Sequence, residues 1–157
     1  MERLMLDDTV GFRLSRVARA RRQAWSQELT HLGLTPPQAA ILRGIAESSD
    51  RSLRSLARTL GTDPMSAKRC VDELESRELV RSSSLPQDRR PRVLNLTDAG
   101  RQVMTELDFL VRRQEVRLRT MLSPVDYQQL LGVLDRLEEG LHLTGSPGER
   151  FDQHGSE

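Results

Sequence analysis

Several residue types that particular classes of protein require are scarce in this sequence. One cysteine among 157 residues excludes an internal disulfide and a metal site built from several cysteines. The three histidines are far apart and give no zinc-ligand spacing. No apolar run approaches the roughly 20 residues of a membrane span, and the opening residues contain no apolar stretch of signal-peptide length. We therefore expect a cytoplasmic protein with no metal, no cofactor and no membrane partner.

Aromatic residues make up only 3% of the chain, while 36% of residues are hydrophobic and 30% are charged. This composition argues against a large self-contained core and favours burial against a second subunit. The sequence also lacks a glycine-rich phosphate loop and a nucleophile elbow, and it displays no convergent set of catalytic polar groups. We therefore do not expect an enzyme.

Charge is unevenly distributed, although the formal net charge is only +1. Residues 51–95 contain ten basic and six acidic residues, a net charge of +4, and the rest of the chain carries −3. Of the 24 basic residues only Lys68 is a lysine, and the planar fork of arginine suits phosphate contacts. A basic middle between more acidic ends predicts a nucleic-acid face held by an assembly scaffold.

Apolar periodicity and capping residues predict six helices, at about 9–30, 35–48, 52–61, 62–80, 97–122 and 123–141. Thr35 and Gln38 form a capping-box pattern at the start of the second helix. The third and fourth helices are short and are separated by a tight turn at Gly61, which is a helix-turn-helix pattern. The fifth helix would be roughly 40 Å long, more than so small a domain can cover. The first, fifth and sixth helices should therefore pair with a second copy of the chain.

Between the fourth and fifth helices, residues 82–97 read as two short strands around a turn. Arg89, Arg90 and Arg92 surround Pro91 at the tip of this hairpin. Such a tip cannot bury three guanidinium groups. It is either a solvated charged turn or a contact for something anionic.

This order of elements closely resembles the MarR family of dimeric winged-helix transcription regulators, with its SlyA-like branch as a candidate. The resemblance covers about residues 10–142 and is most specific in "DRR" at 88–90 followed by "LNLTDAGRQV". Further matching segments are "LTPPQAAIL" and "SLARTLGTDPMSAKRCVDELESRELV". Glu78 departs from the family, which commonly has glycine at this corner between helix and strand, so the local turn is expected to differ.

The resemblance implies a mainly α-helical fold with a small β-hairpin wing, in which a winged helix-turn-helix is joined to a helical dimerisation region. The expected parts are an N-terminal dimerisation helix (1–33), a winged helix-turn-helix DNA-binding domain (34–97), C-terminal dimerisation helices (98–143) and a mobile tail (144–157).

The helix that begins at Asp63 is the candidate recognition helix for a major groove of DNA. Its free backbone N–H groups and positive dipole end suit a phosphate. Ser66, Lys68 and Arg69 are the side chains placed to reach base edges or flanking phosphates. Arg69 is the first candidate because arginine can bind guanine through two parallel hydrogen bonds.

For the hairpin, the resemblance implies that Arg90 inserts into a minor groove, whose negative potential is enhanced where A·T runs narrow it. Asp88 would orient the Arg90 guanidinium, and Arg89 and Arg92 would lie along phosphates. Pro91 stiffens the tip and so lowers the cost of ordering it on binding.

Three further features have two interpretations each. Cys70 is either a small packed thiol or a redox sensor. The arginines of the first helix form either a solvated face or a contact for phosphates or an anionic ligand; they are Arg13, Arg16, Arg19, Arg21 and Arg22. Trp25 and His31 are candidates for a ligand pocket, because relatives bind aromatic acids near the join between scaffold and DNA-binding region. Core packing is the alternative for Trp25.

Taken together, the sequence predicts a homodimeric, sequence-specific regulator of transcription, expected to be a repressor. It would bind a pseudo-palindromic operator of double-stranded DNA, with its two helix-turn-helix units about 34 Å apart. A small aromatic or anionic effector would release it by favouring another separation of the recognition helices. The alternative is a dimeric winged-helix module that binds a protein and not DNA.

Overall fold

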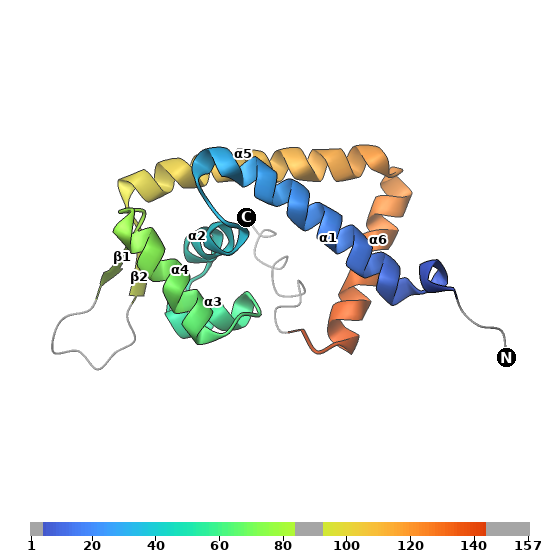
Figure 1. Cartoon of the computed structure of the whole chain (residues 1–157), viewed down its shortest axis with the longest axis horizontal. Coiled ribbons are helices and arrows are strands. Elements are labelled where there is room, and N and C mark those ends of the chain that lie inside the picture. The colour runs from blue at the N-terminus through green and yellow to red at the C-terminus, as the bar shows by residue number, and fades with distance from the viewer. Residues whose placement is uncertain (1–4, 84–92, 144–157) are drawn as a thin grey trace, which may run out of the picture.

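Figure 1 shows the arrangement of helices in the computed structural model, which describes residues 5–83 and 93–143. In chain order the elements are a 3-10 turn (Leu6–Asp8), α1 (Val10–Leu29), a second 3-10 turn (Thr30–Leu32), α2 (Pro36–Glu47), α3 (Leu53–Thr59), α4 (Pro64–Ser76), β1 (Val80–Ser83), β2 (Val93–Leu96), α5 (Asp98–Met121) and α6 (Pro124–Gly140). The predicted fold, mainly α-helical with a small hairpin, is confirmed. The tip of the hairpin and the expected mobile tail lie outside the described residues.

The helices begin where the capping residues predict. At α2, the Thr35 backbone N–H donates to Gln38 Oε1 at 3.0 Å, and the Gln38 N–H donates to Thr35 Oγ1 at 3.4 Å, so the capping box is complete. At α6, Ser123 caps the helix, but the carboxylate of Asp126 accepts from the Ser123 hydroxyl at 2.7 Å. Asp is one methylene shorter than Glu, which accounts for this local contact in place of a complete box.

Helices α3 and α4 are each followed by a residue with a left-handed backbone conformation. Gly61, at φ 62°, follows α3, and the N–H of Thr62 returns to the Ala57 carbonyl. Glu78, at φ 57°, follows α4, and the N–H of Leu79 returns to the Leu74 carbonyl. Both ends are Schellman motifs. The corner at Glu78 therefore has the backbone that glycine favours, so the expectation that the turn would differ because this residue is glutamate was wrong.

One lobe of the molecule holds α2, α3, α4 and the hairpin beneath one end of α5 (Figure 1). Its core is apolar and fully buried at Leu42, Leu56, Leu74 and Leu107. The strands are antiparallel, with Val80 opposite Leu96 and Ser83 opposite Val93. The Leu94 N–H donates to the Arg51 carbonyl, and Ser52 forms a bridge with Val93, so the segment before α3 adds a third short edge to the hairpin.

The other part of the molecule consists of α1, α5 and α6, which extend away from this lobe (Figure 1). Glu28 of α1 accepts from Arg117 of α5 at 2.8 Å, and Arg113 lies 3.3 Å from its other carboxylate oxygen. These helices leave large apolar side chains in solvent, including Phe109 at 65% exposure, and within the described chain α6 buries no residue. Although α5 has 24 residues, no helix of the described residues is long and apolar enough to cross a membrane.

Candidate nucleic-acid interface

The recognition-helix candidate α4 has one buried face and one exposed face. Ala67, Val71 and Leu74 point into the core. The three predicted contact residues, Ser66, Lys68 and Arg69, are all exposed. Helical spacing explains the division, because the buried positions recur at steps of four and three residues. The three predicted major-groove residues are therefore all accessible, with Ser66 and Arg69 facing the groove between α1, α2 and α4 and Lys68 facing the other side of the helix.

The two basic residues of this set, Lys68 and Arg69, differ in the ion pairs that they form. Lys68 Nζ lies 2.5 Å from Asp72 Oδ2, one turn along the same helix, so part of its charge is balanced within α4. Arg69 forms no ion pair with any residue in 5–83 or 93–143. The guanidinium of Arg69 is thus the better placed of the two to meet a base or a phosphate.

The amino end of α4 offers fewer free N–H groups than the sequence suggested. Pro64 has no N–H, and the Ser66 N–H donates to Asp63 Oδ1 at 2.9 Å. Hydrogen bonds from the side chain and the backbone N–H of Ser66 lower the pKa of Asp63, so its carboxylate is ionised at neutral pH. The predicted phosphate site at this helix end is therefore not supported, because a carboxylate already occupies the position.

Contacts on three sides hold α4 in place. Gln38 Nε2 of α2 donates to Glu73 Oε2 at 2.7 Å. Arg77, at the carboxyl end of α4, donates to the carbonyls of Gly33 at 2.8 Å and Leu32 at 3.1 Å. Glu75 Oε1 accepts from the Ser82 backbone N–H of β1 at 2.8 Å. The helix is therefore tied to α2, to the corner between α1 and α2, and to the hairpin.

The hairpin residues predicted to contact DNA lie outside the described part of the chain; they are Asp88, Arg89, Arg90 and Arg92. The strands that lead to the tip are described. Asn95 Oδ1 of β2 accepts from Arg51 Nη1 at 3.0 Å, which joins the hairpin to the segment before α3. The base of the hairpin is thus fixed against the same lobe that presents α4.

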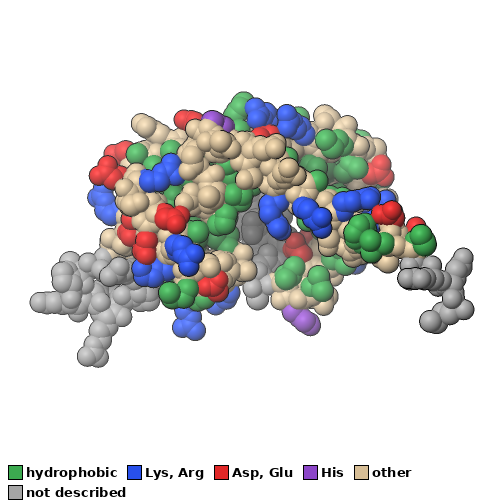
Figure 2. Space-filling model, viewed as in Figure 1, with side chains coloured by type: hydrophobic (Ala, Val, Ile, Leu, Met, Phe, Trp, Pro, Cys, Tyr) green, Lys and Arg blue, Asp and Glu red, His purple; other side chains and the backbone are tan. Residues whose placement is uncertain are grey.

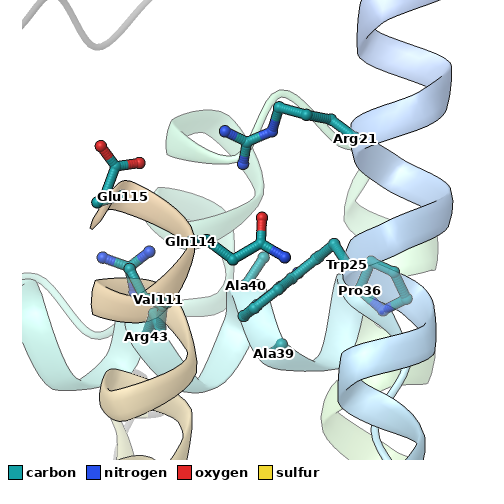
Figure 3. A pocket seen from close by; sticks show the side chains of 9 residues that line it. All are labelled: Arg21, Trp25, Pro36, Ala39, Ala40, Arg43, Val111, Gln114 and Glu115. Carbon is teal, nitrogen blue, oxygen red and sulfur yellow. The ribbon is translucent and has the colours of Figure 1, made fainter. Parts of the chain in front are cut away.

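A pocket of about 180 Å³ lies between α1, α2 and α5 (Figure 3). Trp25 of α1 lines it, as predicted, beside Arg21 from the same helix. The half-buried Trp25 also packs against the core, as its alternative interpretation expects, and its part in ligand binding stays a prediction. His31 does not line the pocket. It lies beyond the end of α1, in the 3-10 turn Thr30–Leu32, and its side chain is exposed, so the structure does not support its predicted place there.

The polar groups of the pocket come from three helices (Figure 3). Arg43 of α2 pairs with Glu47 at 2.8 Å. Glu115 of α5 accepts from the Tyr127 hydroxyl of α6 at 3.0 Å. Gln114 is only 9% exposed, and its side-chain amide makes no hydrogen bond to another described residue. An amide that lines a pocket and has no hydrogen bond to a described residue is a candidate partner for a ligand.

Sequence reasoning did not identify Gln114, Glu115 or Arg43 as pocket residues. One signal for Gln114 was present: it follows Met104, Leu107 and Leu110 on the buried stripe of α5 at helical spacing. A polar residue on an apolar stripe indicates a buried polar site. Sequence reasoning also passed over Met65, which is 72% exposed in the first turn of α4.

Cys70 is half-buried and packs against the core of the lobe. Burial, reinforced by the nearby charge of Glu73, raises the pKa of its thiol. A raised pKa lowers the thiolate fraction and hence the reactivity, which favours the packed-thiol interpretation. Among residues 5–83 and 93–143, no group of three or more histidine, cysteine, aspartate or glutamate side chains could hold a metal ion.

Comparison with known proteins identifies the family. The family model described as "MarR family" matches residues 34–91. A putative transcriptional regulatory protein for the hcr operon of Thauera aromatica is 30% identical to this chain over 129 residues, which cover 82% of this chain and 78% of the relative. The chain belongs to the MarR family. The residues that the family model matches include α2, α3, α4 and β1 of the lobe, and they end just before β2.

Two solved structures of CouR are similar to this protein over most of the chain. CouR from Rhodococcus jostii RHA1 bound to p-coumaroyl-CoA is 29% identical, with a TM-score of 0.75, covering 86% of this chain and 95% of that one. The transcriptional repressor CouR bound to a 23-mer DNA duplex is 28% identical, with a TM-score of 0.76, covering 87% and 99%. The MarR fold therefore extends beyond the matched segment, through α1, α5 and α6.

Proposed function

We propose that this protein is a homodimeric, sequence-specific repressor of transcription that binds a pseudo-palindromic operator of double-stranded DNA. The observation that carries the proposal is the exposed face of α4, with Ser66 and Arg69 accessible while contacts on three sides fix the helix. A fixed helix with accessible polar and cationic side chains is what reading a major groove requires. The likeness to CouR, a repressor solved with a DNA duplex, supports the same function.

The exposed apolar side chains of α1, α5 and α6 support the homodimer. Val17, Phe109 and Leu130 are 61%, 65% and 42% exposed. Large apolar surfaces of this kind mark sites of association. A two-fold dimer would present two copies of α4 and the hairpin to successive turns of one face of the duplex, about 34 Å apart. We propose that residues 1–33 and 98–143 form the dimerisation part and that residues 34–97 form the DNA-binding part.

Within each half-site we propose two modes of reading. Arg69 would bind guanine in the major groove, with Ser66 and Lys68 on neighbouring bases or phosphates. Arg90 would enter the adjacent minor groove, oriented by Asp88, and Arg89 and Arg92 would contact phosphates. The assignment of the hairpin tip rests on the family pattern alone, because these four residues are outside the described chain.

We further propose that an effector with an aromatic ring and an anionic group binds beside Trp25 and releases the repressor from DNA. A cavity of about 150 Å³ can hold benzene, so this pocket of about 180 Å³ has room for one substituted ring. Trp25 offers an aromatic face, Arg21 a positive charge and Gln114 a free amide. CouR, solved with p-coumaroyl-CoA, supports an aromatic acyl group as the ligand. Membership of the SlyA-like branch stays a prediction.

The effector would act by binding two states of the protein unequally. The pocket is formed by α1, α2 and α5, so a ligand in it contacts both the scaffold and the lobe that holds α4. An occupant that fits only one mutual arrangement of these helices would change the separation of the two recognition helices in the dimer.

The decisive experiment is selection of bound fragments from a random duplex pool with the wild-type protein and with Arg69→Ala. The wild type should enrich a pseudo-palindrome, and its affinity should fall steeply with salt because each neutralised phosphate releases counterions. Arg69→Ala should relax the preference at one base position in each half-site, at a cost of about 1 to 3 kcal/mol for the matched base. An unaltered selected-site profile would reject base reading by Arg69.

The same experiment separates the alternative function, a dimeric protein-binding module without DNA binding. That module would enrich no sequence and would associate with duplex DNA weakly, with little dependence on salt. If the dimer binds no duplex DNA even at low salt, the repressor proposal is wrong and the protein-binding module is the remaining function.

A further inference from the structure

The arginines of α1 form a basic surface that base reading by α4 and the hairpin does not use. Residues 9–27 contain five arginines and no acidic residue. Arg16, Arg19 and Arg22 follow one another at steps of three, so they are neighbours on the helix surface, and all three are exposed. We call these three residues the α1 stripe. Figure 2 shows basic side chains gathered over α1. Such a surface is complementary to a polyanion.

The members of the α1 stripe differ in how far their charge is balanced. Arg16 Nη1 lies 3.3 Å from Asp7 Oδ1, and the Arg16 guanidinium lies 5.8 Å from the centroid of the Phe12 ring. Arg19 and Arg22 form no ion pair with any residue in 5–83 or 93–143. Arg19 and Arg22 are therefore the two cations of the stripe that the described chain leaves for a partner.

The side of α1 that carries Arg19 is not the side that a second copy of the chain would cover. Val10, Leu14 and Val17 recur at steps of four and three and are 68%, 41% and 61% exposed, so they form the apolar face of α1. Arg19 comes two residues after Val17, which is roughly 200° further around the helix. A dimer can therefore bury the apolar face and leave Arg19 in solvent.

Arg22 lies next to the proposed DNA-reading residues. It lines the groove between α1, α2 and α4 together with Ser66 and Arg69. The opposite flank of α4 faces the hairpin, because Lys68 lines a hollow together with Ser82 of β1. The recognition helix thus has α1 on one flank and the hairpin on the other, an order that Figure 1 also shows.

We propose that Arg19 and Arg22 bind backbone phosphates of the DNA between the two half-sites, an inference that rests on the proposed function. In the proposed dimer the scaffold helices join the two lobes, so α1 lies on the inner flank of each α4 and the hairpin on the outer flank. The DNA beside the inner flank is the spacer of the operator. A guanidinium donates two parallel hydrogen bonds to a phosphate, and this contact requires no particular base. Arg19 and Arg22 therefore hold the two half-sites in register without reading sequence.

The dependence of operator binding on salt tests the phosphate contact in the full-length protein. Arg22→Gln and Arg19→Gln each remove two phosphate contacts per dimer, so each should lower the salt slope of log affinity by about two units. The selected sequence should not change, since no base contact is lost. Glutamine has nearly the helix propensity of arginine, so α1 should be kept, and thermal unfolding and sedimentation velocity check the fold and the dimer.

Arg112→Gln is the matched control for the loss of charge. Arg112 is exposed, and it comes two residues after the buried Leu110, so it lies on the side of α5 that faces away from the lobe. The change removes the same charge as Arg22→Gln and should alter the salt slope by less than about half a unit.

Uncharged phosphates locate the contact on the DNA. Methylphosphonates in place of the phosphates between the half-sites should weaken binding by the wild type about tenfold. The same duplex should weaken binding by Arg19→Gln/Arg22→Gln less than about twofold, because the contacts are already lost. Methylphosphonates beyond the outer ends of the operator should affect the two proteins equally.

The outcomes separate this proposal from the repressor itself. If spacer methylphosphonates weaken both proteins equally, or if Arg19→Gln and Arg22→Gln alter the salt slope no more than Arg112→Gln does, the α1 stripe is a solvated face and the repressor stands. If the duplex pool yields no preferred sequence but Arg22→Gln still lowers the salt slope on duplex DNA, the phosphate contact stands and the sequence-specific repressor fails. Binding to no duplex at all would overturn both.

Discussion

At Gly100, the first turn of α5 passes so close to the corner between α4 and β1 that no side chain fits. A Cβ at this position would overlap the carbonyl oxygen of Leu79, which is backbone and cannot rotate away. Thr97 fixes the approach, because its hydroxyl caps α5 at the Gly100 N–H and also contacts the Glu78 carbonyl. The glycine of the segment "LNLTDAGRQV", one of those that carry the family resemblance, is therefore explained by close packing of two segments of backbone.

Gly100→Ala should destabilise the protein by about 1 to 3 kcal/mol, the usual range for forcing atoms into a packed site. The measurement is the free energy of unfolding by urea. The matched control is Gly11→Ala near the start of α1, where nothing lies within 4 Å of an added Cβ. That variant should be neutral or slightly more stable, because alanine favours helices over glycine. Equal stability of the two variants would contradict the packing explanation.

Individual residues show where sequence reasoning succeeds and where it stops. Capping residues such as Thr35 and Asp63 were predictable because a cap depends on contacts within three or four residues. The occupation of the α4 amino end by Asp63 was not foreseen, although the same cap causes it. Gln114 and Glu115 were missed as pocket residues because a pocket depends on which helices meet, and periodicity reports only which side of one helix is buried.

At the scale of elements, Arg77 is the contact that couples the recognition helix to the scaffold. It reaches from the end of α4 to the carbonyls of Leu32 and Gly33, the residues that turn the chain from α1 into α2. Both acceptors are orphan carbonyls at the end of a helix, which favour a cationic donor. A shift of α1 relative to the lobe would therefore be transmitted to α4 through this side chain.

Arg77→Ala should reduce operator affinity about fivefold, because α4 would no longer be held at a single angle, and should cost about 1 kcal/mol of stability. The dependence of affinity on salt should stay unchanged, since Arg77 contacts carbonyls and not phosphates. Titration of the operator at several salt concentrations checks both expectations. A salt slope lower by about one unit would show instead that Arg77 binds a phosphate.

The hairpin is the second element with a separate test. Arg90→Ala should weaken operator binding about tenfold while the dimer stays intact, and it should reduce the preference for A·T runs beside each half-site. Arg92→Ala is the matched control at the same tip. As a phosphate contact, its loss should weaken binding uniformly across sequences and lower the salt slope by about one unit. An Arg90→Ala protein with wild-type affinity at moderate salt would reject the minor-groove assignment.

At the scale of the whole molecule, the long fifth helix was predictable because helix length follows from periodicity and capping residues, whereas the division of labour between lobe and scaffold stays a prediction. A helix of 24 residues exceeds what the lobe can cover, and α5 indeed contacts the lobe at one end and α6 at the other (Figure 1). Basic side chains gather over α1 on the surface in view, while hydrophobic ones lie near its amino end (Figure 2). The pairing of two copies cannot be read from periodicity, because an apolar stripe does not specify which surface covers it.

The dimer is tested by placing a charge on the stripe of α6. Leu134, 36% exposed, lies on the stripe with Leu130 and Leu137, and burying such a side chain contributes about 1.5 to 3 kcal/mol. In a two-fold dimer each substitution occurs twice, so Leu134→Glu should raise the dissociation constant of the dimer more than a hundredfold. Sedimentation velocity over a range of protein concentrations measures this change.

Gln128→Glu is the matched control, because it adds the same charge on the opposite side of α6 and should leave the dimer intact. A monomeric Leu134→Glu protein should keep its fold and still bind a single half-site, but it should lose the joint binding of two half-sites, since the second helix-turn-helix is no longer held near the first. If Leu134→Glu stayed dimeric and bound the full operator as tightly as the wild type, α6 would lie outside the interface. The spacing of the recognition helices would then have to be fixed by α1 and α5 alone.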